Sequence, residues 1–268
     1  MNEIRTNLTP PTYHRTNKFT VGFQEIVDAY GVASYREVNP GLFAIVTFPF
    51  LFAVMFGDVG HGLIVSIFAI WMCYYEKSLE SKKWGEIWAT FFGGRYIILL
   101  MGLFSLYTGI IYNDAFSQTV TFFKSAISFT YDEVEDKWIG KQWRSYPYVI
   151  GVDSAWHGAE NALLFSNSYK MKMSILFGVC QMSFGVVLSL FNHRFFRRPL
   201  SIYTEFLPQI IFLESIFGYL SIMIIYKWMA WSEPSTAPGL LNTLIYMFLK
   251  PGTVEAQLYA GQVYYFLC

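Results

Sequence analysis

The stretch Gly41–Tyr75, which reads GLFAIVTFPFLFAVMFGDVGHGLIVSIFAIWMCYY, decides the fold class. Asp58 is the single Asp, Glu, Lys or Arg in it, and it lies among glycines that favour a bend. One soluble core rarely hides so much apolar surface, whereas lipid accepts it readily. The stretch therefore predicts membrane helices at Gly41–Gly57 and Leu63–Tyr75, as a two-helix hairpin or as one kinked helix.

The whole chain has the same character. Of its residues 54% are hydrophobic and only 14% are charged, against about a quarter in soluble domains. The net charge is zero, so nucleic acid is not an expected partner, and membrane lipids are. The cysteines Cys73, Cys180 and Cys268 have neither metal-site nor disulfide spacing, and no cofactor is expected.

Further apolar segments approach the length of about 20 residues that a bilayer requires. They are Tyr96–Tyr112, Met173–Asn192 and Phe206–Tyr226. The run Leu240–Leu249 is shorter and predicts an interfacial helix, and another span begins near Gln262. The predicted fold is all-α: a polytopic transmembrane helical bundle of about five spans plus a truncated sixth.

Positive charge sets the expected topology. Arg194, Arg197 and Arg198 follow the fourth apolar segment, which places this connector in the cytosol by the positive-inside tendency. Counting back favours the hairpin and a cytosolic N-terminus. We predict the end of a cytosolic N-terminal domain at 1–40 and a transmembrane domain at 41–268 with a lumenal loop at 113–172. Binding of acidic lipid headgroups is a second interpretation of the three arginines.

Asp58 and His61 are three residues apart and would share a helix face. One interpretation is a polar pair near the lumenal mouth of a proton path. The other, which we favour, is that Asp58 caps the following helix while His61 lies at the membrane interface.

Two further positions are candidates for a proton path. Glu214 lies near the middle of its span, where it serves either as a relay carboxylate or, as we favour, in an interhelical hydrogen bond. Lys172 and its neighbour Lys170 begin the fourth span. Their side chains either reach the lumenal headgroups or pair with an acidic residue such as Asp58, and the first is favoured.

Small and polar residues recur at helical spacing in three of the spans. The stripes are Gly102, Ser105 and Gly109; Ser174, Gly178, Gln181 and Gly185; and Glu214, Gly218 and Ser221. Stripes of this kind let helix backbones approach closely, so each predicts a helix–helix contact.

Several strings resemble the a-subunit family of V-type ATPases, in family order from about residue 10 to the C-terminus. The most specific is Thr47–Gly62, TFPFLFAVMFGDVGHG. Others are Pro10–Tyr13, Thr16–Thr20, Phe23–Gly31, Gly94–Gly102, Tyr112–Asp114, Lys170–Ser174, Leu190–His193, Phe217–Leu220 and Tyr226–Trp228. Glu214 departs from the family, which usually has a neutral polar residue there.

The resemblance implies a non-catalytic stator subunit in the membrane sector of a rotary proton pump, contributing to organelle acidification. Its implied partners are the proteolipid ring, other membrane-sector subunits and, through an N-terminal domain, the peripheral stalk and the V1 sector that hydrolyses ATP. Vacuole or lysosome, Golgi, endosome and plasma membrane are the implied locations. The family's essential arginine lies on helices beyond Cys268, so the sequence is expected to be a fragment that does not pump alone.

Two alternatives remain open from the sequence. A secondary transporter would carry paired broken helices in two repeated halves, and Pro49 with the glycine bend supplies only one such element. A genuinely short structural or assembly isoform would occupy the same partners without conducting protons.

Overall fold

The computed structural model describes residues 12–80, 85–121, 123–132, 137–142, 148–230, 239–250, 258–259 and 262. These residues are mostly helical and fall into two compact units, 1–174 and 175–268. In chain order the first helices are α1 (Val21–Tyr30), α2 (Gly41–Met55), α3 (Val59–Tyr74), α4 (Glu76–Glu80), α5 (Glu86–Gly93) and α6 (Arg95–Tyr112). Strands β1 (Ile127–Asp132) and β2 (Lys137–Gln142), the 3₁₀ turn η1 (Ser154–Gly158) and helix α7 (Ala162–Phe195) follow.

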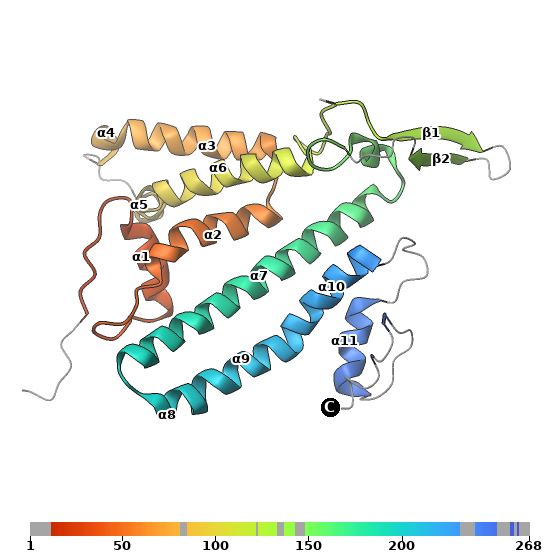
Figure 1. The fold of residues 1–268 in the computed structure, drawn as a ribbon. Helices are drawn as coiled ribbons and strands as arrows, with labels where there is room; N and C mark the ends of the chain where they lie inside the picture. The colour runs from red at the N-terminus through yellow and green to blue at the C-terminus, as the bar shows by residue number, and fades with distance from the viewer. Residues whose placement is uncertain are drawn as a thin grey trace, which may run out of the picture. The chain divides into compact units, whose positions relative to one another are not determined.

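The glycine-rich bend separates two helices, as predicted. Helix α2 ends at Met55 and α3 begins at Val59, so 41–75 is not one kinked helix (Figure 1). At about 1.5 Å per residue, their 15 and 16 residues span less than the hydrocarbon core of a typical bilayer. Among the described residues, α6, α7 and Pro199–Ala230 are long and apolar enough to cross a membrane, while α2 and α3 are shorter apolar helices.

Helices α3 and α6 cross with their backbones in close contact. A methyl group at Gly102 would meet Ser66, and one at Gly109 would meet the backbone of Val59 and Asp58. The contact predicted from the stripe Gly102, Ser105 and Gly109 is therefore confirmed, and its partner is α3.

Helix α6 also binds the end of α2 through hydroxyl groups. The last carbonyls of a helix lack intrahelical donors. Here the Thr108 hydroxyl donates to the Ala53 carbonyl at 2.9 Å, and the Tyr112 hydroxyl donates to that of Val54 at 2.7 Å. These bonds satisfy polar groups that lipid could not, and they fix α2 to α6.

The opposite end of this bundle is held by charge. The guanidinium of Arg95, which is buried at the start of α6, lies 3.0 Å from the Glu76 carboxylate. The Lys18 ammonium, in the segment before α1, lies 2.7 Å from the same carboxylate. The N-terminal segment is thereby tied to the beginnings of α4 and α6.

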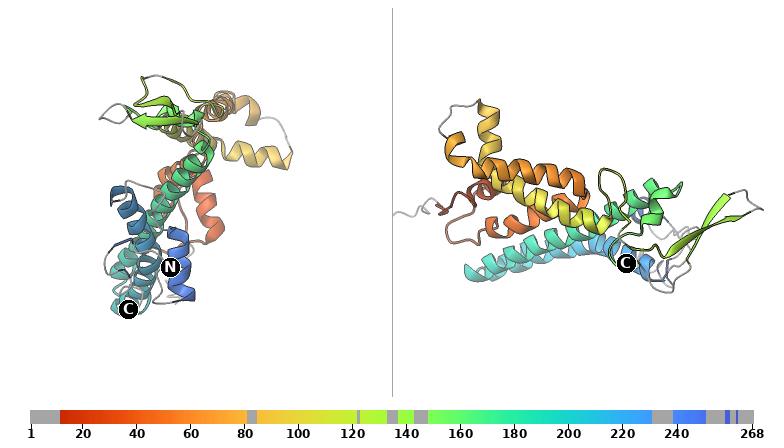
Figure 2. Two further views of the ribbon diagram at one scale, coloured as in Figure 1. Left: turned by 90° about the vertical axis from the view of Figure 1, so that its right-hand side faces the viewer. Right: turned by 90° about the horizontal axis from the view of Figure 1, so that it is seen from above.

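The long connector after α6 is partly ordered by a hairpin. Strands β1 and β2 pair antiparallel, with Tyr131 opposite Trp138, and project beyond the ends of α3 and α6 (Figure 2). The Asp153 carboxylate caps η1 and accepts the Ala126 amide at 2.8 Å, which ties the base of the hairpin to the turn. The sequence yielded no assignment for these elements, and Glu133, Glu135 and Asp136 of its acidic cluster lie outside the described residues.

The second unit contains most of α7 and a long broken helix. Residues Pro199–Ala230 run through α8 (Pro199–Ser201), η2 (Ile202–Phe206), α9 (Leu207–Leu213), η3 (Glu214–Gly218) and α10 (Tyr219–Ala230). Segments η2 and η3 are π-helical. Both this helix and α7 extend past the apolar stretches predicted for them, because polar residues continue the helix outside the hydrophobic core.

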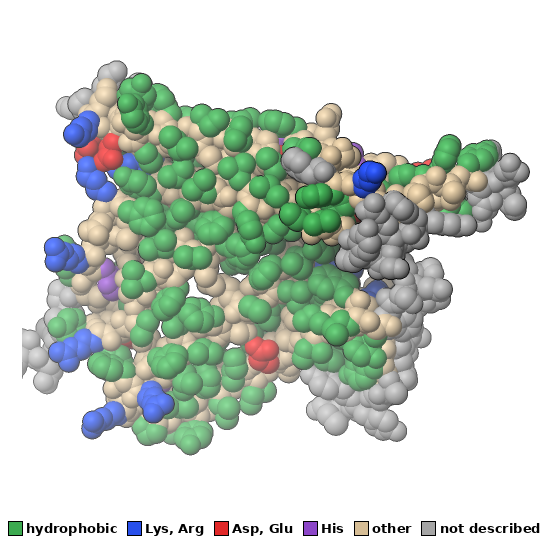
Figure 3. All heavy atoms as spheres, turned by 45° about the horizontal axis from the view of Figure 1, so that its top comes forward, with side chains coloured by type: hydrophobic (Ala, Val, Ile, Leu, Met, Phe, Trp, Pro, Cys, Tyr) green, Lys and Arg blue, Asp and Glu red, His purple; other side chains and the backbone are tan. Residues whose placement is uncertain are grey.

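Helix α10 packs against the C-terminal part of the chain. Tyr219, Met223 and Leu258 form a buried cluster, and the Gln262 side-chain amide donates to the Tyr219 hydroxyl at 3.1 Å. Helix α11 (Leu240–Leu249) matches the predicted short helix. The predicted sixth span lies outside the described residues after Gln262. Hydrophobic side chains cover most of the helical surface visible in Figure 3.

Candidate functional site

The Asp58 side chain organises the beginning of α3. Its backbone is extended, and its carboxylate accepts the amides of Gly60 at 2.7 Å and His61 at 3.1 Å. Free amides at a helix start need acceptors, which is why an aspartate is favoured there. The capping role expected for Asp58 is thus present in the structure.

His61 and the loop after α6 close over this carboxylate. The His61 ring nitrogen Nδ1 lies 2.9 Å from Asp58 Oδ2, and the Phe116 amide donates to Oδ1 at 3.2 Å. Burial opposes ionisation of Asp58, but these hydrogen bonds and those of the α3 amides outweigh it and hold the pKa below its usual range. Asp58 is therefore an anchored anion at neutral pH.

An ion pair lies beside the Asp58–His61 contact. The Lys170 ammonium, on α7, is 3.3 Å from the Asp114 carboxylate and 5.1 Å from the centre of the Tyr112 ring. The Asp114 carbonyl accepts the Val59 amide at 2.9 Å, so the loop that carries Asp114 also touches the start of α3. The Lys170–Asp114 ion pair and the Asp58–His61 pair are therefore linked through a backbone hydrogen bond.

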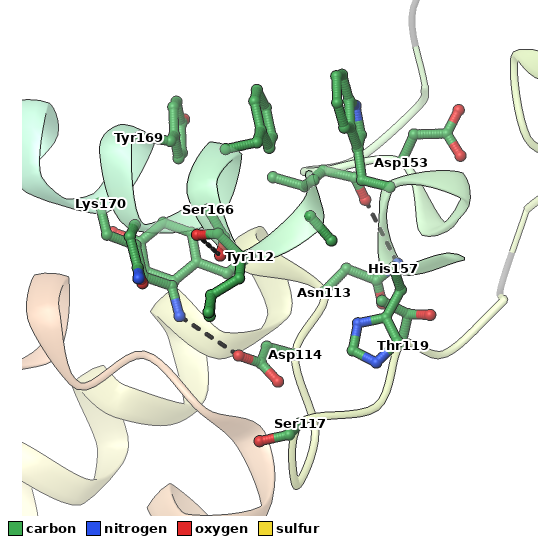
Figure 4. Close-up of a pocket in the computed structure, with 16 residues that line it drawn as sticks. Tyr112, Asn113, Asp114, Ser117, Thr119, Asp153, His157, Ser166, Tyr169 and Lys170 are labelled. Atoms are coloured by element: carbon green, nitrogen blue, oxygen red, sulfur yellow. Dashed lines mark hydrogen bonds and ion pairs between the residues drawn. The ribbon is translucent and has the colours of Figure 1, made fainter. Parts of the chain in front are cut away.

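Tyr112, Asp114 and Lys170 border a cavity of about 400 Å³, shown in Figure 4. Aromatic rings line one side: Trp156 stacks on Phe165 with centroids 4.0 Å apart, and Phe165 stacks on Tyr169. Polar side chains come from the end of α6, the loop after it, η1 and the start of α7, namely Asn113, Asp114, Ser117, Thr119, Asp153, His157, Ser166, Asn167 and Lys170. The cavity suits water and small polar or amphipathic molecules. In the described ranges no three His, Cys, Asp or Glu side chains are arranged to hold a metal ion.

Glu214 lies apart from this cluster, in the second unit. Its Oε1 accepts the Ser183 hydroxyl of α7 at 2.6 Å, and its Oε2 occupies the space that a side chain at position 218 would need. Gly218 therefore lets the carboxyl group fold along its own π-helical segment. This geometry matches the favoured interpretation, an interhelical hydrogen bond.

The predicted site residues are only partly brought together. Asp58 and His61 form a pair. The ion pair considered for the start of the fourth span joins Lys170 to Asp114, whereas Lys172 lies two residues further along α7 and Asp58 is paired with His61 instead. Arg194, Arg197 and Arg198 lie at the turn between α7 and α8, with exposed side chains.

Sequence reasoning missed Asp114 and Tyr112 as members of the cluster. Both belong to the string Tyr112–Asp114, in which polar residues directly follow an apolar span. The change from apolar to polar residues at the end of the span was the signal that could have pointed to these positions. It does not reveal that Lys170, 56 positions away, would be the partner.

Long apolar helices with polar groups gathered at their ends define the class of polytopic helical membrane proteins. The chain belongs to the V-type ATPase 116kDa subunit family, whose sequence profile matches residues 1–267. It is 54% identical over 267 residues to V-type proton ATPase subunit a of Schizosaccharomyces pombe, covering 98% of this chain and 32% of that protein.

Other relatives are similar to a comparable degree. The vacuolar isoform of subunit a of Saccharomyces cerevisiae is 53% identical over 97% of this chain and 31% of its own length. The 116 kDa subunit a 1 of Mus musculus is 50% identical over 98% of this chain and 34% of its own length. The chain thus spans about a third of the curated relatives it matches.

Proposed function

We propose that this chain forms part of the stator in the membrane sector of a rotary V-type proton ATPase and supports proton translocation without hydrolysing ATP. The observation that carries the proposal is the closely packed α2–α3–α6 bundle of a chain belonging to this family. Glycine-mediated contact joins α3 to α6, and buried hydroxyls join α6 to α2. Close packing and interhelical hydrogen bonds of this kind suit a stationary support beside a turning ring.

In this proposal the partners are the proteolipid ring, other membrane-sector subunits and, through the N-terminal domain, the peripheral stalk and V1. Hydrolysis belongs to V1. Residues 1–40 end a cytosolic domain, and 41–268 form the transmembrane domain. The location is the endomembrane system or the plasma membrane.

The proposed topology has five spans, with α2 and α3 crossing as a short hairpin. Residues 113–172 then face the lumen, and the α7–α8 turn faces the cytosol together with the N-terminus. A cysteine placed at Trp138 should react with an impermeant maleimide only from the lumenal side, and one at Arg197 only from the cytosolic side. Equal labelling of both from one side contradicts the topology.

Asp58, His61, Lys170 and Asp114 supply the polar end of the bundle in this proposal. Their ties, one between α3 and the loop after α6 and one between that loop and α7, support a lumenal vestibule through which water reaches the proton path. Lys172 and Glu214 stay secondary candidates, because Lys172 lies two residues along α7 from Lys170 and Glu214 lies in the other unit.

A chimera tests the function. Residues 1–268 would replace the matching third of the Schizosaccharomyces pombe subunit in cells that lack it. We expect recovery of ring subunits on affinity purification and restored vacuolar acidification. The control is the native segment reinserted through the same junctions. Loss of the ring contradicts the stator role, and assembly without acidification contradicts the contribution to proton transport.

A further inference from the structure

The turn between α7 and α8 has an unusual residue at its tightest point. The Arg198 amide donates to the His193 carbonyl at 3.1 Å, and the Arg197 amide donates to that of Arg194 at 3.3 Å. This is the Schellman arrangement that ends many helices, and Arg197 occupies its left-handed position with φ 53°. Glycine is the usual residue there, because a side chain is strained in that conformation. A charged side chain is therefore held at this point at some cost to the backbone.

Positive charge at this turn is not neutralised within the described residues. Arg194, Arg197 and Arg198 are all exposed, and none forms an ion pair with a residue that the structure describes. Glu205 is the sole acidic residue of 193–205, and its carboxylate lies 3.6 Å from His193 Nε2. The end of the α7 dipole favours a cation in the last helical turn, which accounts for Arg194 but not for the two arginines beyond the helix.

The surroundings of the arginines match a membrane surface. The side chains of Phe195, Leu200 and Tyr203 are 61%, 74% and 70% exposed. Large apolar and aromatic groups beside cations are typical of the headgroup zone. The apolar stretches of the two helices end at Asn192 and begin at Phe206, and each is close to the thickness of the hydrocarbon core. The turn between them therefore lies at headgroup depth.

We propose that the α7–α8 turn binds anionic phospholipid headgroups through Arg194, Arg197 and Arg198. The guanidinium group donates paired hydrogen bonds that match a phosphate or carboxylate. Phe195, Leu200 and Tyr203 enter the adjoining acyl-chain boundary. The inference rests on the bilayer placement of α7 within the proposed function, and it does not depend on proton transport.

Native mass spectrometry of the full chain in detergent measures this binding, with phosphatidylserine and phosphatidylcholine as the titrated lipids. A basic residue near an anionic surface contributes about fivefold to a binding constant. The variant R194Q/R197Q/R198Q should therefore bind phosphatidylserine at least tenfold more weakly, with phosphatidylcholine binding unchanged. Unchanged phosphatidylserine affinity in this variant overturns the proposal.

Two single variants separate lipid binding from folding. R197G removes one charge but supplies the residue that the turn geometry favours, so phosphatidylserine affinity should fall about fivefold without a lower melting temperature. R36Q is the matched control, because Arg36 is also exposed and has a positive φ of 68°. An equal loss in R36Q shows a nonspecific charge effect and overturns the assignment to the turn.

Soluble inositol hexakisphosphate distinguishes a lipid site from a general phosphate site. We expect it to compete weakly, since it lacks the acyl chains that the apolar side chains contact. Binding as tight as that of phosphatidylserine contradicts a lipid site. If the triple variant in the chimera loses phosphatidylserine preference but still assembles and acidifies, the lipid inference stands apart from the pump function. If the lipid result fails while acidification holds, only the lipid inference is lost.

Discussion

Two stripes of small residues that look alike in sequence behave differently in the structure. On α6, Gly102 and Gly109 meet the backbone of α3 so closely that a methyl group has no room. On α7, no side chain or neighbouring helix among the described residues of the same unit comes within 4 Å of the place where a methyl group would stand at Gly178 or Gly185. The helix–helix contact predicted for the first stripe is present, whereas the two glycines of the second stripe do not mark a comparable close approach of backbones.

The difference shows that small residues permit a close helix crossing but do not create one. What distinguishes α6 is the set of hydroxyl groups beside its glycines, which bind carbonyls that α2 leaves free. Glycine removes the side chain that would keep the two helices apart, and the hydrogen bonds fix how the helices are oriented. The bond of α7 to the second helix of its unit, Ser183 to Glu214, is a side-chain pair that needs no close backbone approach.

The largest expected effect is at the crossing itself. G109A would force a methyl group against the backbone of Val59 and Asp58, and such overpacking costs about 1–3 kcal/mol. G178A on α7 is the matched control and should be neutral or slightly stabilising, because alanine favours the helix and meets nothing. Thermal unfolding in detergent measures both. Equal melting temperatures for G109A and wild type would remove the distinction between the stripes.

A smaller effect is expected when one hydroxyl is removed from the α6–α2 contact. Y112F leaves the Val54 carbonyl without its donor in a buried place and should lower stability by about 1 kcal/mol. Y107F makes the same chemical change on the same helix, at a side chain that is 56% exposed, and should be silent. Similar unfolding of the two variants would show that the hydroxyls contribute nothing to this contact.

The Ser183–Glu214 bond should contribute least to global stability. Interhelical hydrogen bonds inside membranes average about 0.6 kcal/mol in double-mutant cycles. A cycle of S183A and E214A should give a coupling near that value, and E214Q, which keeps an acceptor oxygen, should be milder than E214A. A coupling energy larger than the loss of stability in Y112F would contradict this prediction, because the Ser183–Glu214 bond would then contribute more than the α6–α2 hydroxyl bond.

Much of the helical framework is predictable from the sequence. The break at Gly57–Gly62, the capping by Asp58 and the α3–α6 contact follow from residue types that act locally or at helical spacing. The lengths of α7 and of Pro199–Ala230 were underestimated, because hydrophobicity marks where lipid ends and not where helical hydrogen bonding ends.

The cluster around Asp114 could not be predicted in the same way. The ion pair between Lys170 and Asp114 joins residues 56 positions apart. It also depends on the position at which α7 begins, and polar residues such as Ser166 and Asn167 make that position hard to predict from the sequence. The β1–β2 hairpin was missed as well: β1 (ISFTYD) alternates between apolar and polar residues, but its partner β2 (KWIGKQ) does not. Long-range pairing and irregular connectors are set by tertiary packing, about which local patterns carry little information.

Two carboxyl groups differ in the number of hydrogen bonds that they accept. Glu214, within a span, accepts one from a hydroxyl, and Asp153, outside the spans, accepts several. Burial raises the pKa of Asp153, but the Ser125 hydroxyl and the amides of Ala155 and Ala126 lower it more, so the folded value lies below the ordinary 3.8. A lowered carboxyl pKa stabilises the fold above the unfolded value, and the stabilisation is lost as the pH falls through the folded value.

Hydrogen exchange at the Ala126 amide should therefore stay slow, after correction for intrinsic rates, down to about pH 4 and accelerate below it. D153N cannot ionise and should show weaker protection without this acid transition. Protection that is independent of pH in the wild type would mean that the loop is held by its apolar contacts, such as the Trp156–Phe165 stack, and not by this carboxylate.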